Sequence, residues 1–557
     1  MTPLKSYIEL LRRSPAVRII SVSVLVSIII VLTAIIGRTA NRKPVIERIS
    51  PPIGSPGDIM VIHGENFGDS RGTSYAEIAG SRITSTGYLS WSDTSIKLVI
   101  PSNVQDGLVV VVTPSGKSNS GFFANEISIP VAVRSDPQIT TPAVFALEPQ
   151  EAVTGGIIRI TGANFGGSRG VSQVFFTANR EEASGEQGVI PASVFDWDYE
   201  MWSDTEIHVR VPDGSASGPV YVQTERGQSQ GRRLTVLNSA GSKKYTGKLT
   251  YVVQVSADVV NNALNQDASI TLYIPRPALS SFQPYAELND CSPEPLIADD
   301  PYTIIQQRPL SRAVNNKQRF TQTFVVSTYA IESAVNGRRI RAPLDTKRTL
   351  VSTYTAPDKC VPSGDESIKA LAQSVTGRET NPYEQARLLY VYMTENFKIT
   401  EKTRTGNVSP LDLLRRKTGD AYDFAVIYTA LCRQCGIPAL PISGILVESD
   451  SSARAHWWTE LYFEGFGWFP VDVALGSGLK YTSFKYIEDA RDFYFGNLEG
   501  QHIAFSRGWH EIRPSVKNSK TVYRPRAYAL QSIWEEASDS ASSYSSLWNT
   551  PSIQGIY

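Results

Sequence analysis

Two side chains of this chain have the types and spacing of a catalytic base and its partner. His456 opens the strand-like run HWWTELYF, Asp472 lies at the end of GWFPVDV, and the Gly-containing turn EGFG joins the two runs. A hairpin about that turn would bring the imidazole beside the carboxylate. A carboxylate fixes the tautomer of an imidazole and stabilises its cationic form, as a base that activates a nucleophile requires. We therefore expect a base and its orienting acid here.

The nucleophile should come from the helix predicted for GDAYDFAVIYTALCRQCGIPA. Asp420 is a good N-cap, Gly436 suits the C-terminal turn, and Pro438 prevents the helix from continuing. Position 421 then lies in the first turn, where the helix dipole and unpaired N–H groups would lower the pKa of a cysteine. The residue at this position is Ala421, which has no group to activate.

No other side chain of this helix takes the place of the missing thiol. Cys432 is eleven positions further on, about 16 Å along the axis, and Cys435 is farther still. Tyr422 points about 100° away, and a phenol, whose unperturbed pKa is about 10, is a poor nucleophile here. We interpret Cys432 and Cys435 as buried core thiols rather than a redox or metal motif. Asp420 and Asp423 are interpreted as helix-capping acids.

The remaining cysteines and histidines predict no metal or cofactor site. Cys291 and Cys360 lie in or next to one β-rich region, and the sequence leaves open whether they pair or remain two buried thiols. The other histidines show no ligand spacing and are interpreted as ordinary: His63, His208, His502 and His510.

The chain resembles the bacterial transglutaminase-like domain in two segments, Gly419 to Gly444 and His456 to Asp472, and in the trailing YFGNLEGQHIAFSRG. The resemblance spans residues 365–515. It implies a papain-type α+β fold with a Cys, His and Asp mechanism. Carried over by position, His456 is the base, Asp472 is its orienter and the nucleophile falls on Ala421. His456 and Asp472 are then either a relic or binding-site pair, or a merely structural one.

A repeat precedes this region. HGENFGDSRG at His63 returns as TGANFGGSRG at Thr161, and WSDT at Trp91 returns at Trp202, with an insertion expected around REEASGEQG. Short alternating runs between Gly, Pro and Ser indicate two small antiparallel sandwiches, at 44–125 and 142–237. They resemble IPT/TIG domains, which implies Ig-like spacers or binding modules outside the cytoplasm. We expect NFG to be a structural turn with a core Phe rather than a ligand loop.

The other segments complete the predicted organisation. Residues 245–356 are rich in β-branched and aromatic residues and predict a β-rich subdomain, whereas the Ser-rich residues 536–557 predict a flexible tail. From Ile19 to Gly37 no residue is charged, close to the roughly 20 residues that cross a bilayer. We expect residues 1–43 to be a cytoplasmic stub and transmembrane anchor. A cleaved signal is disfavoured by Arg38 at −3 of a cut after Ala40.

The sequence thus predicts a multidomain chain with a transmembrane helix, two Ig-like β-sandwiches, a β-rich subdomain and an α+β transglutaminase-like domain. Lys and Arg total 54, as do Asp and Glu, so no charge excess favours nucleic acid. We expect a pseudoenzyme anchored in a bacterial inner membrane, with peptide or envelope-protein partners in the periplasm. Two alternatives stay open: an active cysteine acyltransferase or peptidase whose cysteine was replaced by Ala421, and adhesion through the Ig-like pair.

Overall fold

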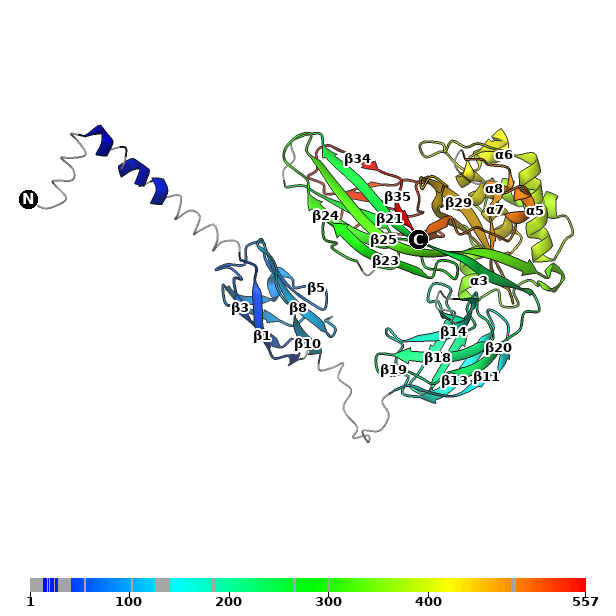
Figure 1. The fold of residues 1–557 in the computed structure, drawn as a ribbon, viewed down its shortest axis with the longest axis horizontal. Coiled ribbons are helices and arrows are strands. Elements are labelled where there is room, and N and C mark those ends of the chain that lie inside the picture. Colours follow the sequence, from blue (N-terminus) through cyan, green and yellow to red (C-terminus); the bar gives the residue numbers. More distant parts are fainter. Residues whose placement is uncertain are drawn as a thin grey trace, which may run out of the picture. The chain divides into compact units, whose positions relative to one another are not determined.

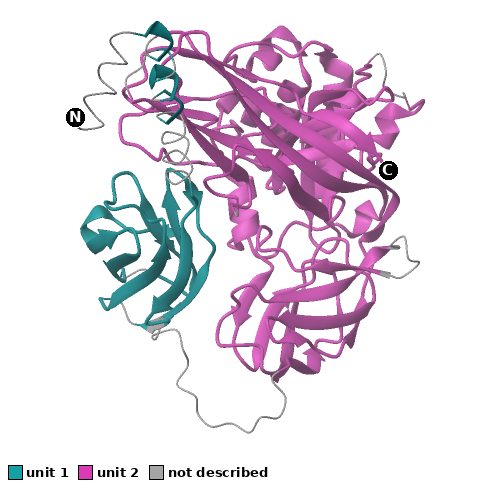
Figure 2. Ribbon diagram, turned by 60° about the vertical axis from the view of Figure 1, so that its left-hand side comes forward, with its two compact units in different colours: residues 1–137 teal, residues 138–557 magenta. Residues whose placement is uncertain are grey.

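The structure, a computed structural model, divides into two compact units, residues 1–137 and 138–557, shown in separate colours in Figure 2. The described residues are 14–17, 19, 21–24, 26–28, 42–54, 57–101, 104–125, 141–181, 187–263, 267–298, 300–481, 484 and 487–557. Most of the apolar segment from Ile19 to Gly37, the predicted membrane anchor, lies outside these residues. Within them, no helix has both the length and the apolar character needed to cross a membrane.

The first Ig-like module, in residues 1–137, is a sandwich of two sheets. Their strand orders are β1-β3-β7-β6 and β2-β10-β8-β4-β5, and β9 pairs with β8. The strands are Val45–Ser50 (β1), Ile53–Gly54 (β2), Ile59–Glu65 (β3), Tyr75–Ile78 (β4), Ser81–Arg82 (β5), Tyr88–Ser92 (β6), Ser95–Val99 (β7), Gly107–Thr113 (β8), Gly116–Lys117 (β9) and Gly121–Asn125 (β10), with a 3₁₀ turn at Ser85–Gly87 (η1). Alternate apolar side chains of both sheets fill the core between them.

The second module repeats this topology. Its sheets have the orders β11-β13-β17-β16 and β12-β20-β18-β14-β15, with β19 on β18. The strands are Ala143–Glu148 (β11), Glu151–Ala152 (β12), Ile157–Ala163 (β13), Gln173–Glu181 (β14), Gln187–Pro191 (β15), Tyr199–Trp202 (β16), Glu206–Arg210 (β17), Gly218–Thr224 (β18), Gly227–Gln228 (β19) and Arg232–Val236 (β20). The insertion expected around Arg180–Gly188 falls at the β14–β15 hairpin, which is longer than its counterpart β4–β5.

The repeated NFG loop has the structural role expected of it. Asn66 and Asn164 adopt left-handed backbone conformations, with φ of 62° and 63°. Phe67 and Phe165 are each 1% exposed, and their carbonyls accept the indole N–H of Trp91 and Trp202, respectively. These loops therefore close the sandwiches by a buried ring and a hydrogen bond.

The β-rich subdomain is built on two long antiparallel strands, Gly241–Asn261 (β21) and Lys317–Val335 (β25), which Figure 1 shows running from the subdomain toward the helices. Tyr285–Ser292 (β23) extends their sheet. A second sheet has the order β24-β22-β33-β32 and is formed by Thr303–Pro309, Ser269–Pro275, Glu535–Ala537 and Lys520–Val522. Because β25 contributes side chains to the cores of both the subdomain and the helical domain, it joins the two.

The prediction of a flexible tail at 536–557 is wrong. Tyr544–Trp548 (β34) and Ser552–Ile556 (β35) both pair antiparallel with β21, and β33 pairs with β22. The ring of Trp548 packs edge-on against that of Trp534 at 4.9 Å, and its indole N–H donates to Glu535. The few aliphatic residues suggested disorder, but the free edge of a long strand supplies backbone partners that the segment cannot find by itself.

The transglutaminase-like region is an α+β domain. Its sheet has the order β30-β29-β28-β31, formed by Gly467–Val471, Ala453–Phe463, Ala439–Val447 and His502–Arg507. The helices are Thr349–Thr355 (α3), Glu366–Thr376 (α4), Pro382–Asn396 (α5), Asp412–Arg416 (α6), Ala421–Gln434 (α7), Val473–Gly476 (α8) and Ala490–Phe493 (α9), with a 3₁₀ turn at Gly337–Arg339 (η2) and a short pair Lys398–Ile399 (β26) and Thr418–Gly419 (β27). Helix α7 is buried from its first residue through Arg433, between the sheet and helices α4 and α5.

Candidate functional site

Helix α7 begins where the sequence predicts. The Asp420 carboxylate accepts from the backbone N–H of Asp423 at 3.0 Å, and the Asp423 carboxylate accepts from the N–H of Asp420 at 3.1 Å. This capping box satisfies orphan donors of the first turn. Ala421 is the first helical residue and is 4% exposed. At the nucleophile position the structure thus presents a buried methyl group.

The two capping acids also bind two arginines. Arg404 donates to Asp420 from its backbone N–H at 2.7 Å and to Asp423 from its guanidinium at 2.5 Å. Arg526 donates to the same acids at 3.1 and 2.7 Å and to the carbonyl of Val408 at 2.8 Å. Burial and the neighbouring Asp420 raise the pKa of Asp423 to about 6, against the lowering effect of both arginines. The capping interpretation therefore extends to an ionic cluster that ties the C-terminal segment to the start of α7.

His456 and Asp472 lie together, as the hairpin argument predicts. The Nε2 atom of His456, on β29, is 2.6 Å from Oδ2 of Asp472, which directly follows β30. Both side chains are fully buried, and the other carboxylate oxygen, Oδ1, accepts from the N–H of Leu475 at 2.8 Å to cap helix α8. Although burial opposes ionisation, the charge and hydrogen bond of His456 and the hydrogen bond of His502 hold the pKa of Asp472 well below its usual range.

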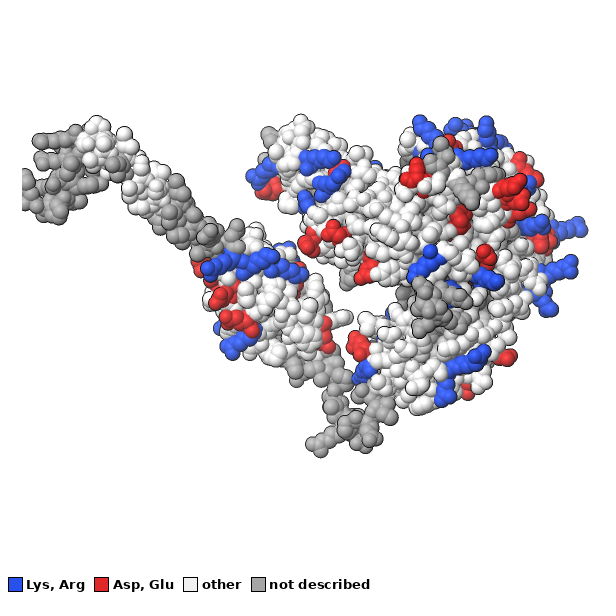
Figure 3. All heavy atoms as spheres, in the orientation of Figure 1, with Lys and Arg blue, Asp and Glu red and all other residues white. Residues whose placement is uncertain are grey.

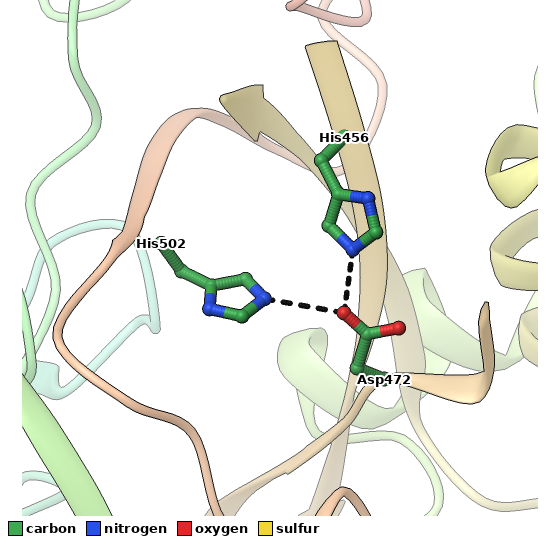
Figure 4. A group of neighbouring side chains, drawn as sticks. All are labelled: His456, Asp472 and His502. Carbon is green, nitrogen blue, oxygen red and sulfur yellow. Dashed lines mark hydrogen bonds and ion pairs between the residues drawn. The ribbon is translucent and has the colours of Figure 1, made fainter. Parts of the chain in front are cut away.

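Two further side chains of the site escaped the sequence argument. His502, interpreted above as ordinary, places Nε2 at 3.1 Å from the same Oδ2 of Asp472, as Figure 4 shows. Its Nδ1 atom is 3.3 Å from Oε1 of Glu499. Tyr481 places its hydroxyl 3.3 Å from Nδ1 of His456. The segment carrying His502 was part of the family resemblance, but no spacing rule connects it with His456.

Sheet pairing brings His502 into the site. Strand β31 pairs antiparallel with β28, which in turn pairs with β29 and its His456. A Cβ atom on Gly444 of β28 would lie 2.0 Å from the carbonyl oxygen of Ile503, so glycine is what permits this close approach. The neighbour of His502 therefore packs directly on the central strand.

The four cysteines, all among the described residues, are free thiols. Cys291 and Cys360 therefore do not pair in this structure. Near the start of α7, the sulfur of Cys360 lies 3.7 Å from the Tyr422 hydroxyl. Burial raises the pKa of Cys360 to about 12 and that of Cys432 well above its usual value, so neither thiol ionises readily.

Comparisons with known proteins identify two domains. The model of the transglutaminase-like superfamily matches residues 369–473, and that of the IPT/TIG domain matches residues 44–127. An uncharacterised protein of Haemophilus influenzae is 26% identical over 171 residues, which cover 26% of this chain and 46% of that protein. A cyclomaltodextrin glucanotransferase of Niallia circulans is 34% identical over 84 residues, 15% of this chain and 11% of that enzyme. The chain thus spans less than half the length of these relatives.

Among solved structures, a candidate cysteine protease from Cytophaga hutchinsonii aligns with a TM-score of 0.36 at 13% identity. The alignment covers 57% of this chain and 91% of that one.

Proposed function

Since the chain contains a transglutaminase-like domain whose nucleophile position holds Ala421, we propose that this protein is a pseudoenzyme that binds peptide segments of other proteins. The observation that carries the proposal is the methyl group at the start of the capped helix α7. An imidazole and its carboxylate can activate a thiol or hydroxyl, but a methyl group has no proton for them to remove.

The surroundings of His456 support the loss of acyl transfer. Because Nε2 of His456 is hydrogen-bonded to Asp472, only Nδ1 is left to accept a proton from a nucleophile. Nδ1 faces the hydroxyl of Tyr481. His456 is 0% exposed and Tyr481 is 7% exposed, so a substrate carbonyl has no open path to the imidazole in this conformation. The nearby Cys360 is kept protonated by burial and cannot replace the missing thiol.

A cavity elsewhere in residues 138–557 supports the binding role. It has a volume of about 220 Å³ and is lined by the second Ig-like module, by the loop around Leu279 and by Trp468 and Arg507 of the transglutaminase-like domain. Val194 and Leu279 are 44% and 49% exposed at this cavity, and Arg507 and Asp213 add opposite charges. Apolar walls with a few polar groups are typical of sites that bind a peptide side chain.

A protein partner also suits the charge of the molecule. On the face shown in Figure 3, acidic and basic side chains are interspersed, in keeping with equal totals of 54 for Lys plus Arg and for Asp plus Glu.

We place the protein at a bacterial inner membrane, anchored by the apolar segment at 19–37, with its domains in the periplasm. The IPT/TIG domain supports an extracytoplasmic location, because such modules commonly serve as spacers or binding modules there.

Two experiments test the proposal. Purified full-length protein incubated with a peptide library and an amine acceptor should give neither a covalent acyl intermediate by mass spectrometry nor a cleaved or transferred product. A product that disappears in the His456→Ala variant would refute the loss of catalysis.

For binding, a photo-crosslinking amino acid at position 194 in cells should capture a protein partner. The matched control is position 237, a leucine of the same module that is 41% exposed and does not line the cavity. Equal crosslinking from both positions, or none from position 194, would refute the assigned binding surface.

A further inference from the structure

Three potential metal-binding side chains, those of His456, Asp472 and His502, lie together. Nε2 of both imidazoles points at the same carboxylate oxygen, Oδ2 of Asp472, as Figure 4 shows. The ligand atoms of the three residues lie within 4.8 Å of one another. All three residues are at most 1% exposed. Two imidazoles and a carboxylate are a donor set that suits Zn²⁺ and similar divalent transition-metal ions. We propose that these three side chains bind such an ion, with Zn²⁺ as the favoured metal.

Each of the three side chains has a polar group near its remaining polar atom, although the contact between His502 and Glu499 lacks hydrogen-bond geometry. Nδ1 of His456 contacts the Tyr481 hydroxyl at 3.3 Å, and Nδ1 of His502 contacts Oε1 of Glu499 at 3.3 Å. The second oxygen of Asp472 accepts the N–H of Leu475 at 2.8 Å. In metal sites such outer partners fix the tautomer of a histidine and the orientation of each ligand. Two members of the cluster have this arrangement, and Glu499 lies where it could provide the third outer partner after a small reorientation.

His502 and Glu499 carry buried polar atoms without a partner. Nε2 of His502 lies 3.1 Å from Asp472, whereas its Nδ1, 3.3 Å from Oε1 of Glu499, and both oxygens of Glu499 have no hydrogen-bond partner among the described residues. Such buried unpaired groups are unfavourable. With a metal ion on Nε2, the imidazole carries its proton on Nδ1 and can donate it to Glu499 after a small reorientation.

The charges nearby leave room for a divalent ion. Within the part of the chain that the structure describes, no lysine or arginine forms an ion pair with Asp472 or Glu499; their ion-pair partners are the two histidines. A divalent ion with two neutral imidazoles would balance both carboxylates. The alternative is a proton on His502 without any metal, and the experiment below separates the two.

Binding an ion requires the three donor atoms to rearrange around it. Ligands about 2.0 to 2.1 Å from a tetrahedral Zn²⁺ lie about 3.3 Å from one another. The pair formed by His502 and Asp472 is at 3.1 Å, and the pair formed by His456 and Asp472, at 2.6 Å, would have to open by about 0.7 Å. The two Nε2 atoms, which lie within 4.8 Å of each other, would have to come to about the same 3.3 Å. A cavity of about 70 Å³, lined in part by Leu475, Tyr481 and Tyr494, lies next to the outer partners of the cluster.

This inference does not depend on the proposed peptide binding, and its test uses the metal alone. Full-length protein stripped with a chelator is titrated with Zn²⁺ in a competition assay and with Co²⁺, whose visible absorption reports four-coordinate binding. We expect one ion per chain. His502→Gln should weaken binding at least 100-fold, and Glu499→Gln, which removes only the outer partner, by about 10- to 100-fold.

The matched control is His208→Gln, which removes a partly exposed histidine that also contacts a carboxylate, that of Glu206, outside the cluster. It should bind Zn²⁺ as the parent protein does. A Cys432→Ser, Cys435→Ser variant must also retain binding, and circular dichroism shows whether each variant is folded. If His502→Gln does not fold, the Zn²⁺ affinity of the Glu499→Gln variant decides whether the proposal stands. Failure of the parent to bind one ion, or unchanged affinity in a folded His502→Gln or Glu499→Gln protein, would overturn the proposal.

Discussion

Replacing Arg526 by methionine tests whether the C-terminal segment secures the start of helix α7. The Arg526 side chain is 4% exposed and donates to Asp420, Asp423 and the carbonyl of Val408. Methionine preserves most of the volume but leaves two buried carboxylates with a single guanidinium, that of Arg404. Removing one partner of a buried ion pair costs about 3–5 kcal/mol, and because Arg404 remains we expect about 3 kcal/mol. This is a large part of the 5–15 kcal/mol that stabilises a typical domain.

The loss should depend on pH in a defined direction. Burial already raises the pKa of Asp423 to about 6, above its value in the unfolded chain, and the Arg526 charge opposes that rise. The folded state therefore holds this proton more tightly than the unfolded state. The associated stability is present at low pH and is lost as pH rises through about 6. Without Arg526 the pKa rises further, so the destabilisation should be larger at pH 8 than at pH 5.

The assay is urea unfolding followed by tryptophan fluorescence at both pH values. The control is Arg415→Met, which breaks an exposed pair with Asp412, where the arginine side chain is 78% exposed, and should change stability by less than about 0.5 kcal/mol. An equal loss at pH 5 and pH 8 would mean that Arg526 acts by packing rather than by charge. A loss no larger than that of the control would refute the cluster as a stabilising feature.

Three further predictions concern stability. Burial opposes ionisation of Glu536, but hydrogen bonds that include those from Ser515, Ser519 and Tyr273 lower its pKa to about 2. Glu536→Gln should therefore lower Tm at pH 7. The difference in Tm between variant and parent should vanish as pH falls from about 4.5 to 2. Burial raises the pKa of Asp198 to about 8, so Asp198→Asn should match the parent near pH 4 and be the more stable protein above pH 8. Deleting residues 541–557 removes β34 and β35, and it should lower Tm and speed amide exchange along β21; unchanged exchange would show that those strands do not protect it.

Local patterns are enough to predict several of these features. The N-cap Asp420, the first-turn position of Ala421 and the hairpin that joins His456 to Asp472 follow from residues close together in the sequence, because capping and hairpin pairing are short-range interactions. The doubled NFG loop predicts the two sandwiches for a similar reason. A left-handed Asn and a buried Phe are requirements of one turn.

The features that the sequence pattern missed depend on contacts between distant segments. His502 reaches Asp472 only because β31 pairs beside β28, and Arg526 reaches the start of α7 from more than one hundred residues away. The Ser-rich C-terminal strands are ordered by the edge of β21, which no property of their own composition reveals. The sequence by itself determined which side chain is missing at position 421 and which two lie beside each other in the hairpin. Only the tertiary structure decided what surrounds that pair, because burial and long-range strand pairing set the charges, the hydrogen bonds and the third donor atom.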